Sequence, residues 1–260
     1  MTAKTSCSVR LPRRGLLGLA AAGIGFGLPA FAGCAPASDL ARGPSPAGPT
    51  PPPAPPPRSS PTPLGDASAP PGSPEEALAQ LFAGNQRFAE GRALAPHRNL
   101  ARLAEVAPKQ TPFAAFLGCA DSRVPIEIVF DQGFGDIFVT RIAGNVADPT
   151  IIGSLEFGTL VLGAKVLFVL GHTSCGAVSA TAKGDAVPGQ ISTLYQHIRP
   201  AVKSSGGDVG RAIVANVKNQ MEVLAEASPV IVQLIKEGKV IVAGGVYDLS
   251  SGRVTPVKAG

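Results

Sequence analysis

The chain has 260 residues, of which 45% are hydrophobic and 16% charged, and this length suffices for one sizeable core or for two domains. Its 26 prolines and 31 glycines are too many for an evenly folded chain. The formal net charge of +5 does not indicate nucleic-acid binding, because residues 1–33 carry four basic residues and no acidic one, and the remainder is almost neutral.

Residues 1–34 have the organisation of an export signal. The pair Arg13-Arg14 precedes GLLGLAAAGIGFGLPAFA, residues 15–32, which is apolar and rich in glycine and alanine. The adjacent arginines resemble a twin-arginine signal, which is read by a route that exports folded proteins. We therefore expect an exported protein, in the bacterial periplasm or on the extracytoplasmic face of the membrane.

The end of this signal leaves two outcomes open. FAGC, residues 31–34, resembles a lipoprotein box and predicts a lipid anchor at Cys34, although Phe31 stands where that pattern prefers Leu. Simple cleavage near Ala32 or Ala35 is the alternative. A permanent transmembrane helix is disfavoured, because glycines and a proline interrupt a stretch shorter than the ~20 apolar residues that a span needs.

Residues 35–72 are predicted to be a linker. They contain 14 prolines, with PTPPPAPPP at residues 49–57. Such a segment buries too little apolar surface to offset the entropy of ordering, and it favours an extended polyproline conformation. It would act as a tether between an anchor and a catalytic domain, or as a plain spacer.

The catalytic domain is expected over residues 73–260. Ser73-Pro74-Glu75-Glu76 has the pattern of a helix start, with Ser as N-cap and Pro at the first helical position. Residues 77–91 continue it with apolar residues at helical spacing.

Short apolar runs then alternate with helical segments. Strands are predicted in residues 112–119, 136–144, 165–172 and 239–248; helices are predicted in residues 150–163 and in residues 208–235, with a break at Pro229. This alternation indicates an α/β fold with a mostly parallel central sheet flanked by helices. Sites in such sheets lie beyond the carboxyl ends of the strands, where Cys119 and His172 stand.

Two stretches at these strand ends hold a candidate metal site. CADSR occupies residues 119–123 and GHTSC residues 171–175. Cys119, His172 and Cys175 form a C-x52-H-x2-C set, and two thiolates with one imidazole are typical of a catalytic zinc (Zn2+) site, since a structural site fills all four positions. The long first spacing suits ligands that come from two strand ends.

Asp121 and Arg123 extend this pattern. A carboxylate two residues from a metal thiolate can bind the metal or orient a zinc-bound hydroxide. Arg123 can hold Asp121 bidentately and keep it ionised. Zinc lowers the pKa of bound water to roughly 7, so this set would supply a nucleophile at neutral pH.

The residues alone leave other interpretations open. Cys119 and Cys175 could form a disulfide in an exported protein, or Cys119 could be a redox or nucleophilic thiol with His172 as its base. His172 could be a turn residue without a ligand role, and Asp121–Arg123 a structural ion pair. His97 and His197 are expected to be solvated surface residues.

Three stretches together resemble the β-class carbonic anhydrases: CADSRVP, FDQGFGDIFVTRIAGN and GHTSCGAV, within a similarity that covers about residues 75–250. The resemblance implies a parallel α/β sheet, assembled as a homodimer or a larger oligomer whose sites commonly draw on two subunits. It implies zinc bound by Cys119, His172 and Cys175, with Asp121 and Arg123 as the catalytic pair and Asp121 as a possible alternative ligand.

The same resemblance implies substrate-binding residues. Gln110 stands where members with an open metal site place a substrate-orienting Gln, and Phe138 matches an aromatic residue that lines their CO2 pocket. Gly176 would offer its backbone N–H to the substrate, although it could equally be a turn glycine. The chain has no Trp, which also favours the open type. Phe157 replaces a frequent Tyr and would remove one hydrogen bond of the family.

The function implied is the zinc-dependent, reversible hydration of CO2 to bicarbonate and a proton. One alternative is a hydrolase of CS2 or COS on the same fold. The other is a non-catalytic, zinc-stabilised binding module, which would have no need for the Asp121–Arg123 pair.

Overall fold

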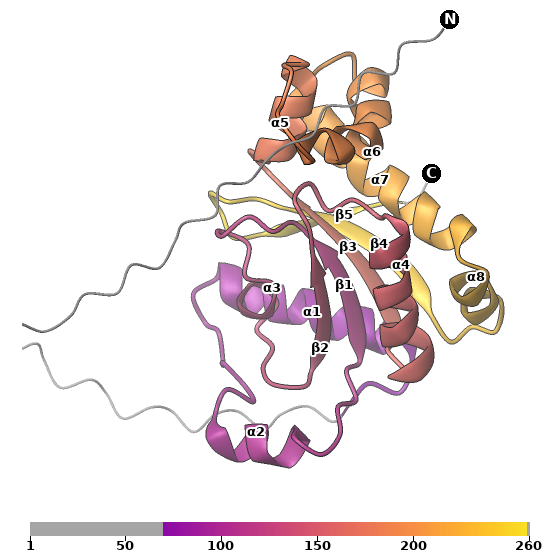
Figure 1. The fold of residues 1–260 in the computed structure, drawn as a ribbon. Helices are drawn as coiled ribbons and strands as arrows, with labels where there is room; N and C mark the ends of the chain where they lie inside the picture. Colours follow the sequence, from indigo (N-terminus) through magenta and orange to yellow (C-terminus); the bar gives the residue numbers. More distant parts are fainter. Residues whose placement is uncertain (1–69, 259–260) are drawn as a thin grey trace, which may run out of the picture. The chain divides into compact units, whose positions relative to one another are not determined.

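The computed structural model describes residues 70–258 (Figure 1). The export signal predicted for residues 1–34 lies outside these residues, as does the predicted linker up to residue 69, so both stay predictions. Within residues 70–258, no helix combines the length and apolar character that crossing a membrane requires.

A five-stranded sheet in the order β2-β1-β3-β4-β5 forms the centre of the described chain. Four strands are parallel, each inside a predicted run, and the α/β fold is confirmed: β1 (Ala114–Gly118), β2 (Ile137–Arg141), β3 (Val166–His172) and β4 (Ile241–Tyr247). The fifth, β5 (Val254–Val257), runs antiparallel to β4 at the edge. The sequence pattern does not predict β5, because it is short and contains Pro256, which an edge strand tolerates.

One face of the sheet is covered by α1 (Pro74–Ala89) and the short α3 (Ile126–Val129). The predicted start of α1 is confirmed, since the Ser73 hydroxyl accepts the Glu76 N–H at 3.2 Å and the Glu76 carboxylate accepts the Ser73 N–H at 3.3 Å. Leu81 of α1 is fully buried in the same cluster as Phe116 and Phe168 of the sheet.

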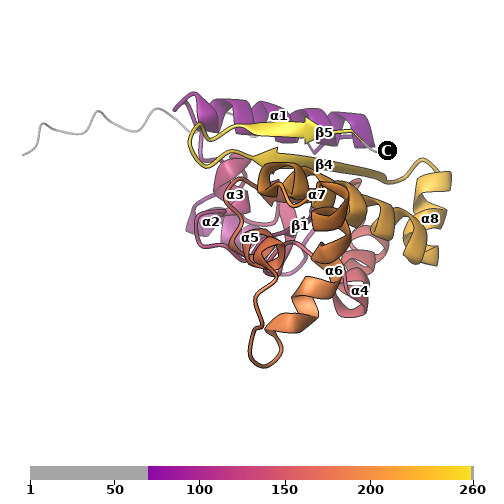
Figure 2. The same cartoon turned by 90° about the horizontal axis from the view of Figure 1, so that it is seen from above.

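The opposite face is covered by α4 (Pro149–Glu156), α7 (Val209–Ala227) and α8 (Pro229–Lys236), as Figures 1 and 2 show. The helix predicted over residues 150–163 is α4 continued by a π-helical turn, η1 (Phe157–Val161). The break expected at Pro229 is also confirmed: α7 ends at Ala227, and the Ser228 hydroxyl caps α8 by accepting the Ile231 N–H at 3.1 Å.

Two glycines of the sheet allow α7 to lie very close to it. A Cβ added at Gly171 of β3 would stand 2.6 Å from Val217 Cγ2, and one added at Gly244 of β4 would stand 2.5 Å from Met221 Sδ. Both distances are shorter than packed atoms allow. The short distance between α7 and the sheet therefore requires that residues 171 and 244 have no side chain.

The carboxyl ends of β1 and β3 are covered by α5 (Gly176–Lys183), α6 (Ile191–Ser204) and the start of α7, whereas α2 (Leu100–Val106) lies near the other end (Figure 1). A third apolar cluster fills the space beneath these three helices. It contains Cys119, Val146, Cys175, Val178, Ile198, Ala212 and Ile213. Two of the predicted metal ligands, Cys119 and Cys175, therefore lie in a buried apolar cluster that is separate from the two main cores.

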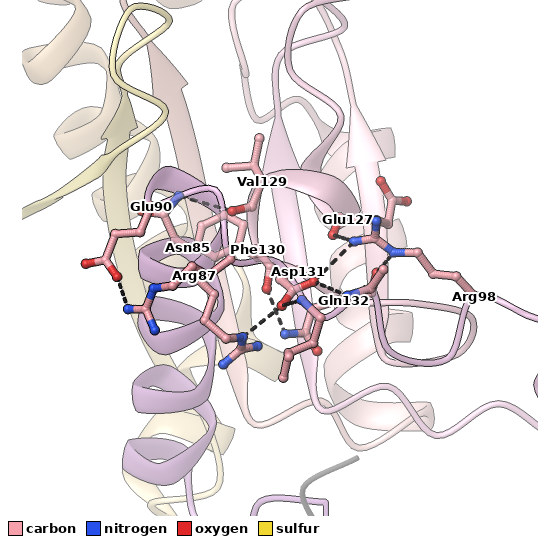
Figure 3. A network of polar contacts seen from close by, with 12 residues as sticks. Asn85, Arg87, Glu90, Arg98, Glu127, Val129, Phe130, Asp131 and Gln132 are labelled. Carbon is pink, nitrogen blue, oxygen red and sulfur yellow. Dashed lines mark hydrogen bonds and ion pairs between the residues drawn. The ribbon is translucent and has the colours of Figure 1, made fainter. Parts of the chain in front are cut away.

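A buried carboxylate ties the segment before α2 to the rest of the domain. Asp131, just after α3, is fully buried and has a left-handed backbone with φ of 50°. Its two oxygens accept Arg87 Nε at 2.8 Å and the backbone N–H groups of Leu94 and Ala95 at 3.0 and 2.8 Å. Figure 3 shows Asp131 between Arg87 of α1 and Arg98, whose Nη2 is 3.7 Å from Oδ1.

Replacing this carboxylate should destabilise the fold. Asp131→Ala leaves two backbone N–H groups and the Arg87 guanidinium without their acceptor and removes the charge that faces Arg98, so we expect the free energy of unfolding to fall by about 3 kcal/mol. Urea denaturation measures this loss. Glu90→Ala is the control, because the contacts of Glu90 are exposed to solvent and should contribute little to stability. Equal losses in the two variants would contradict the role given to Asp131.

Candidate functional site

The pairing of β1 with β3 brings the first two candidate ligands together. The strands are parallel, with Gly118 opposite Leu170, so Cys119 emerges next to the end of β3, where His172 is the last residue. The chain leaves β1 toward β2 on one side and returns as β3 on the other. Ligand sites of open α/β sheets lie at such a reversal of strand order.

Cys175 completes the set from the start of α5. The turn between β3 and α5 is fixed on the end of β4, because Thr173 N–H donates to the Tyr247 carbonyl at 2.9 Å and Thr173 Oγ1 accepts the Leu249 N–H at 3.0 Å. Cys175 is the N-cap residue of α5, and the positive end of a helix dipole favours a thiolate there. The ligand atoms of Cys119, His172 and Cys175 all lie within 4.8 Å of one another.

The imidazole of His172 is oriented as a ligand. Its Nδ1 lies 3.0 Å from the Thr173 carbonyl oxygen, which assigns the ring proton to Nδ1 and leaves a lone pair on Nε2. The residue is fully buried, and Nε2 has no hydrogen-bond partner, a condition shared in residues 70–258 only by Asn145 Nδ2 among buried side-chain atoms. A buried acceptor without a donor is costly unless a cation lies beside it.

The two thiols lie close together, and each shifts the pKa of the other. Both are buried, and neither forms a disulfide. The pKa of Cys119 is lowered, first by the hydrogen bond from Cys175 and also by the Gly144 N–H, which lies 3.3 Å from Sγ. The pKa of Cys175 is raised by the same contact with Cys119 and by burial. A cation bound among these atoms would satisfy both sulfurs and His172 Nε2 together.

Asp121 lies beside this cluster and is held by Arg123 as the sequence predicts. Arg123 donates from Nε to Asp121 Oδ1 at 2.9 Å and from Nη2 to Oδ2 at 2.7 Å. These bonds hold the pKa of Asp121 far below its ordinary value. Oδ2 is 3.9 Å from His172 Nε2, so an ionised carboxylate borders the ligand atoms. The Asp121 side chain is 17% exposed and that of Arg123 54%, which makes this the open side of the cluster.

Two further residues, for which the sequence pattern predicts no role, position the Cys119 loop. Arg141, at the end of β2, donates from Nε to the Cys119 carbonyl at 2.9 Å and from Nη2 to the Asp121 carbonyl at 2.5 Å. Gly144 donates its N–H to Cys119 Sγ. Both lie in the stretch FDQGFGDIFVTRIAGN, which carries the family resemblance but no local signal of these contacts.

Gly176, the first residue of α5, directly follows a candidate ligand. Apart from its chain neighbours and the backbone of its own helix, a Cβ placed on it would meet no atom within 4 Å. Packing therefore does not require a glycine at this position, and the residue leaves open space beside Cys175.

Gln110 and Phe138 are not brought to the metal cluster of their own chain. Phe138 pairs with Ala115 near the amino end of β1, and Gln110 precedes that end. At about 3.3 Å per residue, β1 alone separates its two ends by about 13 Å. Gln110 instead lines a surface depression with Val106, Lys109, Thr111 and the segment 160–163 that leads to β3.

The two histidines outside the cluster differ from each other. His97 was expected on the solvated surface, and this is wrong, because its Nδ1 lies 2.7 Å from Asp136 Oδ1 and its side chain is only 26% exposed. His197 contacts only the Gln196 amide, at 3.3 Å, and its exposure is intermediate.

Comparison with known proteins gives one consistent result. A family model described as "Carbonic anhydrase" matches residues 114–254. A carbonic anhydrase of Mycolicibacterium smegmatis is 36% identical over 193 residues, which cover 71% of this chain and 94% of that protein. Carbonic anhydrase 2 of Mycobacterium tuberculosis is 36% identical over 189 residues, covering 70% and 91%.

Two solved structures agree with these sequence relatives. A β-carbonic anhydrase of Aspergillus fumigatus has a TM-score of 0.57 at 26% identity, covering 70% of this chain and 91% of that one. A Coccomyxa β-carbonic anhydrase, solved in complex with acetazolamide, has a TM-score of 0.55 at 27% identity, covering 69% and 86%.

The geometry of the cluster predicts the effect of removing one sulfur. Cys175→Ala should reduce bound zinc from about one ion per chain to a small fraction, since three protein ligands are the fewest that a catalytic zinc site retains. Metal analysis after dialysis measures this, with Ser179→Ala of the same helix as control. Zinc affinity should also fall as pH is lowered, because both thiols must lose their protons. Unchanged zinc content in Cys175→Ala would exclude this residue as a ligand.

Proposed function

The chain belongs to the β-class carbonic anhydrases, which interconvert CO2 and bicarbonate, and from this we propose that Cys119, His172 and Cys175 hold the zinc ion of that reaction. The observation that supports this assignment is the buried set of ligand atoms within 4.8 Å, with an ionised carboxylate at its open side. Two sulfurs and one imidazole suit zinc, and three ligands leave a position for catalysis. Bound zinc would supply a nucleophile near neutral pH by lowering the pKa of a water molecule.

Asp121 acts as a hydrogen-bond acceptor in this proposal and does not store the proton. Its pKa is so low that the carboxylate stays ionised near neutral pH, because Arg123 donates to both of its oxygens. Oδ2 is therefore available to accept a hydrogen bond from the O–H group of the attacking oxygen. This bond would orient a lone pair of that oxygen toward the carbon of CO2. Since Arg123 engages both oxygens, this arrangement favours Asp121 as a positioning acceptor over Asp121 as a fourth ligand.

Gly176 provides room for the substrate. A methyl group on its Cα would meet no atom within 4 Å apart from its chain neighbours and the backbone of its own helix, and its N–H belongs to the first turn of α5. A helix N-terminus has backbone donors without intrahelical partners, and these can bind the oxygen of a small, polarised substrate. Any side chain at residue 176 would reduce this space.

The remaining substrate residues come from a second copy of the chain in this proposal. Gln110 and Phe138 lie near the amino end of β1, away from their own ligand cluster. The surface around them is apolar and exposed: Phe157 is 47%, Leu160 56% and Val161 62% accessible. A second copy that covered this surface could receive Gln110 and Phe138 at its metal site, so the active unit would be at least a dimer.

The proposed role of Asp121 predicts a separation of activity from metal binding. Asp121→Asn should lower kcat/KM for CO2 hydration by about 100-fold or more, because the amide nitrogen beside Arg123 cannot accept the same hydrogen bonds. Stopped-flow hydration at pH 8.5 measures the rate, and metal analysis should show zinc retained.

Two outcomes would contradict this assignment. Loss of zinc in Asp121→Asn would make Asp121 a ligand. A zinc-loaded wild-type protein that is inactive on CO2 would overturn the proposed reaction, and the same instrument would then test CS2 and COS.

The two-copy site predicts complementation between inactive chains. Gln110→Ala impairs substrate binding and Cys175→Ala removes the metal, so each variant alone should have little activity. Co-expressed as a mixed dimer, they would form one intact site, and total activity should rise to about one quarter of the wild-type value when chains pair at random. If the mixture shows only the average of the two variants, Gln110 acts within its own chain.

A further inference from the structure

Two buried amide side chains interrupt the apolar face that α7 presents to the domain. Asn216 is 1% exposed and Gln220 is 2% exposed, and they lie one helical turn apart among buried residues that are otherwise apolar: Ala212, Ile213, Val217, Met221 and Leu224. A buried amide costs stability unless it is hydrogen-bonded. Their presence therefore points to specific partners.

Those partners belong to the loop that follows β2. Asn216 Nδ2 donates to the Gly144 carbonyl at 2.9 Å, and Gln220 Oε1 accepts the Ala147 N–H at 2.8 Å. Gln220 Nε2 in turn donates to Asn216 Oδ1 at 3.3 Å, which orients the Asn216 amide. The two amides thus hold the loop at two points, 144 and 147, from one side.

The same loop reaches the metal cluster through one hydrogen bond. Gly144 N–H donates to Cys119 Sγ at 3.3 Å. Gly144 has a left-handed backbone with φ of 75°, and a Cβ there would stand 2.6 Å from Ile198 Cδ1. The position of this N–H is therefore set by a backbone conformation and a close approach that both favour glycine.

We propose that Asn216 and Gln220 are positioning residues of the metal centre, which keep the Gly144 N–H directed at the Cys119 sulfur. The proposal rests on the function given above, because it takes Cys119 to be a zinc ligand. A hydrogen bond to a metal thiolate withdraws electron density from the sulfur and fixes its direction, and loss of such an outer contact typically lowers metal affinity about 10- to 100-fold. Burying two amides costs stability, and in return the direction of the Cys119 sulfur is fixed.

Removal of these amides should change the metal centre itself. In Asn216→Leu the Gly144 carbonyl loses its donor and the loop can turn its N–H away from the sulfur. We expect zinc affinity to fall about 10- to 100-fold. In the cobalt-substituted protein the thiolate-to-cobalt charge-transfer band should move to longer wavelength, because the sulfur lone pair rises in energy when it loses its hydrogen bond.

Gln220→Met removes the second anchor with little change in volume. The same two effects are expected in this variant, and they should be smaller, because Gln220 acts on Gly144 through Asn216. If Asn216→Leu yields no folded protein, Gln220→Met alone decides the proposal.

Asn85→Leu is the matched control. Asn85 is also a buried amide, which donates to the Val129 and Gly252 carbonyls and accepts the Val254 N–H, on the other face of the sheet. Its loss should destabilise the fold and leave the cobalt band and the zinc affinity unchanged.

The outcomes separate this inference from the proposed function. A wild-type protein without any thiolate-to-cobalt band would overturn the metal site itself. A wild-type band that is unchanged in both α7 variants, with wild-type zinc affinity, would overturn the positioning role and leave the metal site standing. A shift of the same size in Asn85→Leu would also overturn it, since any buried amide would then have the effect.

Discussion

The parallel pairing of β1 with β3 is the constraint on which the rest of this domain depends. Alternate residues of the two strands enter two different cores, with Phe116 and Phe168 toward α1 and Leu117 and Val169 toward α7. A slip of one residue would exchange the two sets and bury each in the wrong core, so the register is strongly specified. The same register places Cys119 next to His172. The packing of the sheet therefore fixes the distance between the first two ligands before any polar contact contributes.

The polar contacts then divide the site into a closed side and an open side. On the closed side, two sulfurs and an imidazole are buried, and apolar residues surround the sulfurs. On the open side, Asp121 and Arg123 reach solvent, and their mutual hydrogen bonds fix the carboxylate in its charged form. The closed side thus favours a bound cation, and the open side allows a small neutral molecule to approach it from solvent. Arg141 supports both sides at once, since it binds the carbonyls of Cys119 and Asp121.

Much of the fold and the candidate ligand set could be predicted from the sequence, because these features depend on short, local sequence patterns. The parallel strands, the start of α1 and the break before α8 follow from local patterns of apolar, capping and proline residues, and the ligand set follows from two short stretches at strand ends. Asn216 and Gln220 had no such signal, because their partners lie more than 70 positions away and an amide on a helix is usually solvated. Gln110 and Phe138 were identified by resemblance, which names residues but does not tell which chain they serve. His97 was misjudged because its partner, Asp136, is distant in sequence.

The close approach of α7 to the sheet connects the packing of the domain with the contacts around Cys119. Val217, which follows Asn216, rests on the bare backbone of Gly171, which precedes His172. The helix therefore rests on the sheet at a position without a side chain. From there, Asn216 reaches the Gly144 carbonyl, and the Gly144 N–H donates to Cys119 Sγ. A methyl group on Gly171 would push Val217 away from the sheet and move Asn216 with it, so the position of the Gly144 loop depends on a side chain that β3 lacks.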